Sequence, residues 1–272
     1  MSEEAEEAPA GVDPTTPSSA RIYDFMLGGT NNFQADRDAL GNAQLSASEL
    51  RDIAWANRGF HQRSVKWIAE RGIRQFIDIG SGLPTVGNTH EVVRKVIPDA
   101  RVVYVDIDPM VAAHSSALLA DDGGTKVVTA DIRDPDAVLA AAALRELIDF
   151  SEPAALVLTA VLHFVADSSD PWGLVARYVA ELAPGSYLAL SHATSDNMPP
   201  IAVQGASQVY SNAFYMRPKA KVEQFFDGLE LVAPYAGAEP AVVYMGLWGC
   251  EDPELADSDG SRWGYSGVAR RP

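Results

Sequence analysis

The stretch "FIDIGSGLPT", residues 76–85, decides the fold of this chain. Apolar residues that favour strands run directly into Gly80, Ser81 and Gly82. Such glycines let a ligand approach the backbone closely, so the turn is typical of a nucleotide-binding loop. Two features depart from the dinucleotide fingerprint: Thr85 stands where a third glycine is expected, and Asp78 lies inside the strand. The stretch therefore predicts a cofactor site and leaves the cofactor open.

Around this stretch the sequence predicts a parallel sheet with helices on both faces. Strand-like segments alternate with amphipathic helical segments after residue 72, and right-handed crossovers make such strands parallel. The predicted strands span residues 75–79, 102–106, 126–130, 155–160 and 186–191, with helices around residues 88–97, 109–120, 135–148 and 171–182. Two closing strands are expected at residues 229–232 and 265–270. The expected fold is α/β, with a doubly wound, mostly parallel sheet.

The segment before the sheet divides into two parts. Residues 1–17 are acidic and rich in Ala, Pro and Thr, which predicts disorder. Residues 18–72 are predicted to be helical: a glycine pair ends a first short helix, and Ser46 with Glu49 forms a capping box before a long one. We therefore expect a disordered tail over 1–17, an N-terminal helical cap over 18–72 and a cofactor-binding domain over 73–272.

Composition narrows the possible partners. The 272 residues include 37 acidic and 21 Lys or Arg residues, and the net charge of −16 repels nucleic acid. No run approaches the roughly eighteen apolar residues of a membrane span, and the acidic N-terminus is unlike a signal peptide. The single cysteine, Cys250, forms no internal disulfide. We expect a cytoplasmic protein that acts without nucleic acid or membrane, and its oligomeric state stays open.

Acidic residues end the next two predicted strands. Asp106 lies 24 residues beyond Gly82, where a carboxylate can accept both hydroxyls of a ribose. Asp131 ends the third strand, where it can accept an adenine amino proton, while Ile107 and Ile132 cover the ring. Because the carboxyl ends of parallel strands meet at one edge of the sheet, these residues together predict an adenosine site.

Two cofactors carry such an adenosine. A nicotinamide dinucleotide needs a helix N-terminus close beneath its pyrophosphate, and Asp78 brings a negative charge toward those phosphates. S-adenosylmethionine is a net cation, so the same charge attracts it. Tyr215 and Lys219 have the spacing of a short-chain dehydrogenase pair, but Pro218 between them is poorly tolerated in a helix. The residues favour S-adenosylmethionine.

The motifs also carry a family resemblance. "RIYDFMLGGTNNF", "FIDIGSGLPT", "LPTVGNTHEV", "VVYVDIDP" and "ADIRDP" resemble a largely actinobacterial family of S-adenosylmethionine-dependent methyltransferases, most without an assigned substrate, over residues 18–272. The resemblance implies a class I methyltransferase fold, Rossmann-like, with a seven-stranded sheet and a reversed final hairpin. It implies that Asp78, Gly80 and Gly82 contact the methionine end, Asp106 the ribose, and Asp131 with Ile132 the adenine. The segment "APYAGAEPAVVYMGLWG" departs most from the family pattern.

The early motif admits two interpretations. Tyr23, Gly28 and Gly29 can form a lid over the cofactor, because a glycine pair lets the backbone close tightly. A glycine pair also simply ends a helix. The resemblance favours the lid.

The acceptor side is predicted less sharply. His163 and His192 follow the fourth and fifth strands and are candidate bases, although a histidine there can also just orient a loop. The place after the fourth strand lacks the Asn- or Asp-Pro-Pro-Tyr motif of nucleobase and amide methyltransferases, which favours a small hydroxylated or amino metabolite. Tyr210, Tyr215 and Arg217 are expected to face it.

Three functions remain as hypotheses. A methyltransferase is favoured, because only a sulfonium cofactor uses both the loop and Asp78. A non-catalytic protein that binds S-adenosylmethionine, or an NAD(P)-dependent oxidoreductase, are the alternatives. The remaining histidines, His61, His90 and His114, lack the spacing of a metal site, so no metal is expected.

Overall fold

The computed structural model describes residues 8–9, 11–41, 43, 45–118, 122–211 and 213–272. Residues 1–7 and 10 of the predicted acidic tail, and residues 119 and 120 of one predicted helix, lie outside the described residues. In the described part of the tail, Asp13 accepts hydrogen bonds from Thr15 and Thr16, and the carbonyl of Thr16 accepts one from Arg21.

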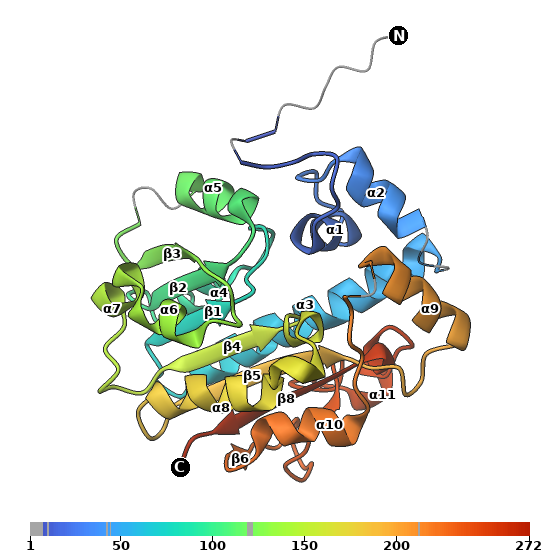
Figure 1. Cartoon of the computed structure of the whole chain (residues 1–272). Coiled ribbons are helices and arrows are strands. Elements are labelled where there is room, and N and C mark those ends of the chain that lie inside the picture. Colours follow the sequence, from blue (N-terminus) through green and yellow to red (C-terminus); the bar gives the residue numbers. More distant parts are fainter. Residues whose placement is uncertain (1–7, 10, 42, 44, 119–121, 212) are drawn as a thin grey trace.

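The described residues form one α/β sheet with a doubly wound order (Figure 1). The strand order is β3-β2-β1-β4-β5-β8-β6, with the short β7 paired to β8. Strands β1 to β5 are parallel, and β8 runs antiparallel to β5, β6 and β7. The strands are β1 (Gln75–Ile79), β2 (Arg101–Asp106), β3 (Thr125–Thr129), β4 (Ala155–Thr159), β5 (Tyr187–Ala193), β6 (Glu230–Leu231), β7 (Val243–Tyr244) and β8 (Gly264–Arg270). The predicted fold is confirmed, and each predicted strand ends within two residues of an observed one.

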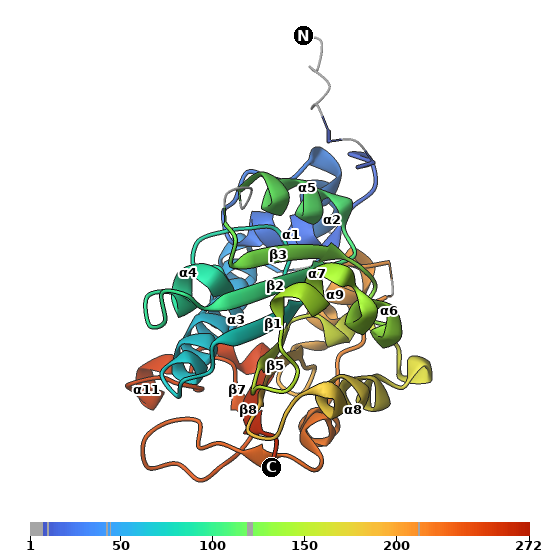
Figure 2. The ribbon, with the colours of Figure 1, turned by 90° about the vertical axis from the view of Figure 1, so that its left-hand side faces the viewer.

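Helices cover both faces of the sheet (Figure 2). One face packs against α3 (Ala47–Ala69) and α4 (Thr89–Val93), where Phe60 and Val93 contact Phe76 and Val102 of the strands. The other face packs against the helices that precede and follow β4 and against one helix that follows β5. These are α6 (Pro135–Ala140), α7 (Ala142–Leu147), α8 (Pro171–Glu181) and α10 (Lys219–Glu223). The capping box of Ser46 and Glu49 is present at the start of α3, as predicted.

Alternation along β1 determines which way its side chains point. Ile77 and Ile79 belong to the core beneath α6, α7 and α8, whereas Phe76 belongs to the core beneath α3 and α4. Because successive strand residues point to opposite faces, Asp78 points with Phe76 toward α3 and α4. Its side chain is therefore buried between the sheet and these helices.

A separate small core joins segments that are far apart in the sequence. Ile22 and Met26 of α1 (Ser19–Met26) and Leu40 of α2 (Gln34–Gly41) pack with Ala54 of α3 and Val209 of α9 (Pro200–Val209). Figure 1 shows α1, α2 and α9 grouped above the carboxyl ends of the strands. The sequence did not predict α9. Below, α1, α2 and α9 together are called the helical cover.

The late part of the chain was only partly predicted. The strand β7 was missed, because two residues give no periodicity. It lies in the segment that departs from the family pattern, where Trp248 is fully buried against Phe60 and Trp67. The remaining elements are α5 (Pro109–Leu118) after β2 and α11 (Pro253–Ala256) before β8.

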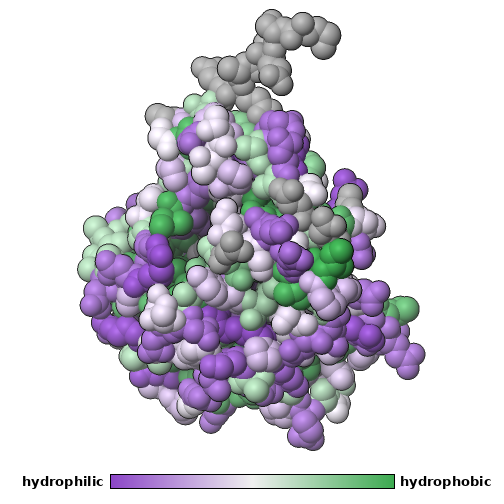
Figure 3. Space-filling model, turned by 45° about the vertical axis from the view of Figure 1, so that its right-hand side comes forward, coloured by the Kyte–Doolittle hydropathy of each residue, from purple (hydrophilic) through white to green (hydrophobic). Residues whose placement is uncertain are grey.

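The surface is mixed in character. Hydrophilic residues dominate the lower body in Figure 3, and apolar ones are gathered mainly where the upper part meets this body. Among the described residues, none of the helices combines the length and the apolar composition needed to cross a membrane.

Candidate active site

A cavity of about 340 Å³ lies at the carboxyl ends of the parallel strands. It is centred where the winding reverses between β1 and β4, the place where doubly wound sheets bind ligands. The strands provide its polar floor, and the helical cover provides much of its apolar wall. The cavity therefore has two sides of different chemistry.

The glycine loop forms the floor beside β1. Gly80 has φ of 74° and Gly82 has φ of 66°, conformations that other residues rarely adopt. A Cβ atom on Gly80 would collide with Val161, whereas one on Gly82 would point into open space. The hydroxyl of Ser81 is buried and has no partner in the described residues. The loop thus offers a close backbone approach and a polar group that a ligand can satisfy.

The loop does not lead directly into a helix. Helix α4 begins only at Thr89, after a turn in which Thr85 N donates to Asn88 Oδ1 at 3.0 Å. A dinucleotide pyrophosphate is normally bound at a helix N-terminus immediately beneath such a loop. The geometry therefore fits a cofactor without phosphates at this position. Tyr215 and Lys219 are not on one helix, because α10 begins at Lys219 after Pro218.

Asp106 lies at the end of β2 and lines the cavity. Its Oδ2 accepts a hydrogen bond from Gly82 N at 2.8 Å, and its Oδ1 accepts one from Asp108 N at 2.9 Å. Burial raises the pKa of this carboxyl. Each oxygen keeps a further lone pair, so the carboxylate is held ready to accept hydroxyl groups.

The adjacent strand end supplies an apolar clamp. Ile107 is 59% exposed although it lines the cavity, and Ile132 lies on the same wall. Asp131 also lines it, but its carboxylate pairs with Arg133, which lowers the pKa of Asp131. An exposed isoleucine at the edge of a cavity can pack against the planar ring of a ligand, which removes its apolar surface from water.

Asp78 does not line the cavity. It is 3% exposed, and its Oδ2 accepts a hydrogen bond from Thr89 Oγ1 at 2.6 Å. Burial raises the pKa of Asp78 to about 6. The side chain of Asp78 therefore lies behind the glycine loop and does not make the predicted direct contact with a cofactor.

Helix α3 contributes residues to the cavity that the sequence analysis missed. Arg58 is buried, and it donates to Val86 O, Thr85 Oγ1 and Asn88 Oδ1 around the glycine loop. No carboxylate of the described residues forms an ion pair with it. A buried cation without a counter-ion beside a ligand cavity can bind an anionic group of the ligand.

Two more residues of α3 reach the cavity. Asn57 accepts from Ser191 Oγ at 2.5 Å and donates to the Tyr23 hydroxyl at 2.8 Å. His61 contacts Thr159 at the end of β4. Positions 57, 58 and 61 share one helix face, but helical spacing alone is also what core packing produces, so it gave no functional signal.

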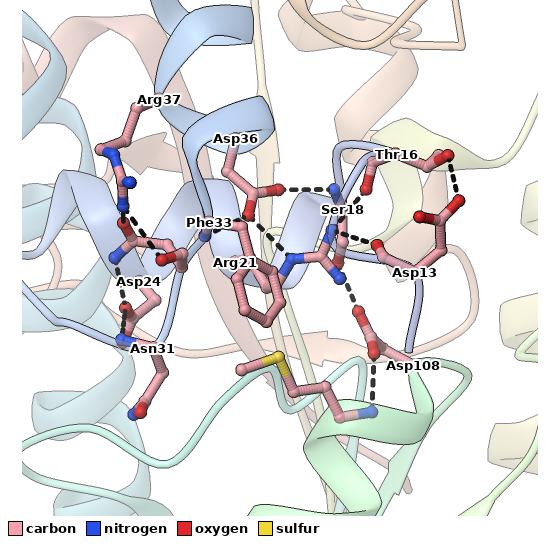
Figure 4. Close-up of polar contacts among 12 residues, drawn as sticks. Asp13, Thr16, Ser18, Arg21, Asp24, Asn31, Phe33, Asp36, Arg37 and Asp108 are labelled. Atoms are coloured by element: carbon pink, nitrogen blue, oxygen red, sulfur yellow. Dashed lines mark hydrogen bonds and ion pairs between the residues drawn. The ribbon is translucent and has the colours of Figure 1, made fainter. Parts of the chain in front are cut away.

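The early motif is divided between lining and support. Tyr23 lines the cavity, and its hydroxyl donates to Ala54 O. Gly28 and Gly29 do not line it; they form a turn around the buried Asp24, with Gly28 at φ of 85°. Asp24 accepts from Asn31 N at 2.9 Å (Figure 4). The expected cofactor contact of the two glycines is therefore replaced by a structural role in shaping this turn.

A second polar cluster connects the start of the helical cover with the loop that follows β2. Arg21 pairs with the fully buried Asp36, which also accepts from Ser18 N and Phe33 N (Figure 4). The hydroxyl of Ser18 in turn bonds to Asp108, two residues beyond Asp106. The start of α1 is thereby tied to the loop that follows β2.

The two candidate bases differ in how many of their ring nitrogens already have hydrogen-bond partners. Both nitrogens of His192 are occupied: Nε2 contacts Arg217 at 2.6 Å, and Nδ1 contacts Ala193 O at 2.7 Å. His163 lines the cavity, and within the described residues its ring makes one hydrogen-bond contact, of 3.5 Å between Nδ1 and Ala193 N. Burial lowers the pKa of both rings, that of His192 to about 3.

Of the three residues expected to face the acceptor, only Tyr210 lines the cavity. Its ring stacks on Phe214 with centroids 4.8 Å apart. Arg217 is buried and donates to the carbonyls of Leu162 and Val165, so it supports the loop after β4 and does not face the cavity. Tyr215 N donates a hydrogen bond to His163 O in that loop, and Tyr215 does not line the cavity.

The acceptor side of the cavity is mainly apolar. Ala160, with φ of 55°, is held in a strained conformation at its base, where its N–H faces Ser191. Among the described residues, no group of three or more His, Cys, Asp or Glu side chains could hold a metal ion. The apolar lining comes from the helical cover, from α3 and the residues just before it, and from segments that follow β4: Met26, Leu40, Leu45, Leu50, Ile53, Phe164, Met198, Val209, Phe214, Met245 and Trp263.

Comparison with known proteins places the chain among methyltransferases. The family model described as "S-adenosyl methyltransferase" matches residues 5–272. The crystal structure of a candidate methyltransferase from Thermobifida fusca is 43% identical, covering 97% of this chain and 98% of that chain with a TM-score of 0.88. A DUF574 family protein from Streptomyces avermitilis is 39% identical, covering 96% and 99% with a TM-score of 0.86.

More distant structures share the fold alone. An O-methyltransferase family protein from Burkholderia thailandensis is 14% identical, covering 82% of this chain and 60% of that chain with a TM-score of 0.50. No curated protein matches the chain.

Proposed function

The chain belongs to the S-adenosyl methyltransferase family, and from this premise we propose that it methylates a small molecule bound beneath the helical cover. It is an S-adenosylmethionine-dependent methyltransferase. The observation that carries the acceptor class is the cavity itself: about 340 Å³ must hold cofactor and acceptor together. A cavity of this size accommodates small molecules.

The cofactor is proposed to lie along the strand ends. In this placement the methionine portion lies over Gly80, Ser81 and Gly82, its carboxylate is bound by Arg58, and Asp106 accepts the ribose hydroxyls. Asp131, Ile107 and Ile132 then surround the adenine. The support is the open space at Gly82 and, among the described residues, the unpartnered hydroxyl of Ser81 and the buried guanidinium of Arg58, which forms no ion pair.

The catalytic contribution of the protein is proposed to be mainly alignment. S-adenosylmethionine supplies a methyl group that is already activated, so holding the acceptor in line contributes most, and good orientation saves about 7 to 11 kcal/mol. Where a base is needed, His163 is the better candidate, because His192 has both nitrogens occupied. Tyr210 is the aromatic residue proposed to contact the acceptor.

Two broader features support a soluble metabolite as the acceptor. The net charge of −16 disfavours a nucleic-acid substrate, and the single cysteine suits the reducing cytoplasm. We also propose that residues 18–72 act as the cap and residues 73–272 as the cofactor-binding domain.

Calorimetric titration tests the cofactor assignment directly. S-adenosylmethionine and S-adenosylhomocysteine should both bind, and NADH should not. Tight binding of NADH alone would contradict the proposal. A screen of small alcohols, phenols and amines with cofactor labelled in its methyl group then tests catalysis, and binding without transfer to any acceptor would favour a non-catalytic binding protein.

A further inference from the structure

Four side chains form a continuous hydrogen-bonded chain from the buried face of the sheet to the cavity. Asp78 Oδ2 lies 2.6 Å from Thr89 Oγ1, which lies 2.9 Å from His61 Nε2. His61 Nδ1 lies 3.1 Å from Thr159 Oγ1. Each residue belongs to a different element: β1, α4, α3 and β4.

The first three residues of this hydrogen-bonded series are buried away from water. Thr89 is fully buried, and Asp78 and His61 are each 3% exposed. Thr159 lines the cavity together with His61. Within the described residues, the Thr159 hydroxyl has no hydrogen-bond partner other than His61. The hydrogen-bonded series thus ends at the Thr159 hydroxyl, which can form a further hydrogen bond to a ligand in the cavity.

The direction of every bond follows from the chemistry of the ends. An ionised carboxylate only accepts, so the Thr89 hydroxyl must donate to Asp78. Thr89 must then accept from His61 Nε2–H. Burial and the nearby Arg58 lower the pKa of His61 to about 3, so the ring is neutral and Nδ1 carries no proton. Nδ1 therefore accepts, and the Thr159 hydroxyl must be its donor.

We propose that Asp78, Thr89 and His61 are positioning residues that present the Thr159 hydroxyl oxygen to the cavity as a hydrogen-bond acceptor, so that the methylated group is an alcohol, phenol or amine bearing hydrogen. The inference rests on the proposed function, because it names the class of acceptor at the same site. An acceptor that donates O–H or N–H to Thr159 has a lone pair turned elsewhere, toward the methyl donor. When that lone pair attacks the methyl carbon, the sulfur–methyl bond breaks and S-adenosylhomocysteine leaves with its electron pair. The methylated acceptor then gives up its proton to solvent or to His163, which lines the cavity.

The groups around Asp78 are consistent with an ionised carboxylate at neutral pH. Burial raises the pKa of Asp78 to about 6; the hydrogen bond from Thr89 and the charge of Arg58 on α3 lower it, and Asp106 of β2 raises it. Tyr104 of β2 is also near, with a hydroxyl that bonds to the N–H and ring of His90 on α4. These groups leave Thr89 as the donor that faces the carboxylate.

The tautomer of His61 is the decisive measurement. In protein labelled with ¹⁵N-histidine at pH 8, long-range proton–nitrogen spectra should show His61 neutral, with the proton on Nε2. His61→Gln identifies its signals. A proton on Nδ1, or a doubly protonated ring, would overturn the proposal.

Matched substitutions separate positioning from packing. Thr89→Val removes the hydroxyl at similar volume and should leave both tautomers populated, whereas Thr89→Ser should restore the single one. If Thr89→Val fails to fold, Thr159→Val, at the cavity end, serves instead: it should shift the Nδ1 signal while the proton stays on Nε2. An unchanged Nδ1 signal would contradict the bond to Thr159.

The acceptor class is tested with paired probes in the presence of S-adenosylhomocysteine. Phenols and anilines, each beside its fully methylated counterpart, are compared by ligand-detected NMR. The hydrogen-bearing members should bind about tenfold more tightly to the native protein, as one good hydrogen bond implies, and equally to Thr159→Val. Equal binding of both members to the native protein, or binding of no pair, would overturn the proposal. If the native protein does not bind S-adenosylhomocysteine, the proposed function is overturned instead.

Discussion

The two sides of the cavity are built by opposite means. The cofactor side consists of strand ends and tight turns between residues 79 and 132, fixed by parallel hydrogen bonding within the central sheet, together with Arg58 of α3. The acceptor side combines α1, α2 and α9, which come from distant parts of the chain and share a small core with α3, with apolar residues of α3 and of later segments. Polar groups with fixed directions suit a cofactor with many hydrogen-bonding atoms, and apolar packing suits the less polar part of a small acceptor.

This contrast predicts how the two sides respond to substitution. Removing a polar group from the cofactor side leaves buried partners unsatisfied, which costs more than the group itself contributed. Removing a contact from the helical cover leaves an apolar cavity that a different acceptor can fill. Large effects on cofactor affinity should therefore be confined to the strand side.

The largest effect is expected at Asp106. Asp106→Ala removes the proposed acceptor of both ribose hydroxyls, each worth roughly 1.5 to 3 kcal/mol, so cofactor affinity should fall at least 100-fold. Calorimetric titration with S-adenosylhomocysteine measures it. Asp134→Ala is the matched control, because Asp134 also follows a strand but only caps α6. Near-native affinity of Asp106→Ala would show that the ribose lies elsewhere.

The next largest effect is expected at Asp78, on the free energy of unfolding. Its folded pKa, about 6, is above the unfolded value of 3.8, so the stability linked to this carboxyl is present at low pH and lost as pH rises through 6. Asp78→Asn does not ionise. Relative to the native protein, it should therefore gain about 2 kcal/mol in unfolding free energy between pH 4 and pH 8. Urea unfolding at both pH values measures this. A difference that does not change with pH would mean that the buried carboxyl has an ordinary pKa.

Arg58 should affect one part of the cofactor only. Arg58→Met removes the proposed partner of the methionine carboxylate and should weaken S-adenosylmethionine about tenfold. Decarboxylated S-adenosylmethionine is the matched ligand, and its affinity should change little in the variant. Arg101→Met, at the far end of β2, is the control for lost charge. An equal loss for both ligands would assign Arg58 to holding the loop at residues 85–88.

The same contrast explains what the sequence could predict. The strand positions, the glycine loop and the location of Asp106 at a strand end were predictable because each depends on residues adjacent in sequence and on the rule that parallel strand ends meet. Asp78 was assigned to the cofactor because a carboxylate beside the loop attracts a net cation and because the family resemblance implied the contact. Strand alternation instead turns its side chain toward α3 and α4.

Long-range packing accounts for the rest. Arg58 and His61 belong to a helix that precedes the sheet, and nothing in their spacing distinguishes lining from core. Arg217 was expected at the acceptor because it follows an aromatic segment, yet its guanidinium finds carbonyls in the loop after β4. Such partners are set by tertiary structure, which a local pattern does not contain.

The smallest effect on the cofactor is expected at Tyr210, on the acceptor side. Its ring packs against Phe164 and Phe214, and within the described residues its hydroxyl has no hydrogen-bond partner. Tyr210→Phe keeps the packing, so S-adenosylhomocysteine affinity should stay within twofold and unfolding free energy within about 0.5 kcal/mol. With an acceptor identified by the screen, KM should rise while kcat stays unchanged, because uniform binding is lost. A tenfold loss of cofactor affinity in this variant would mean that the two sides of the cavity are not energetically separate.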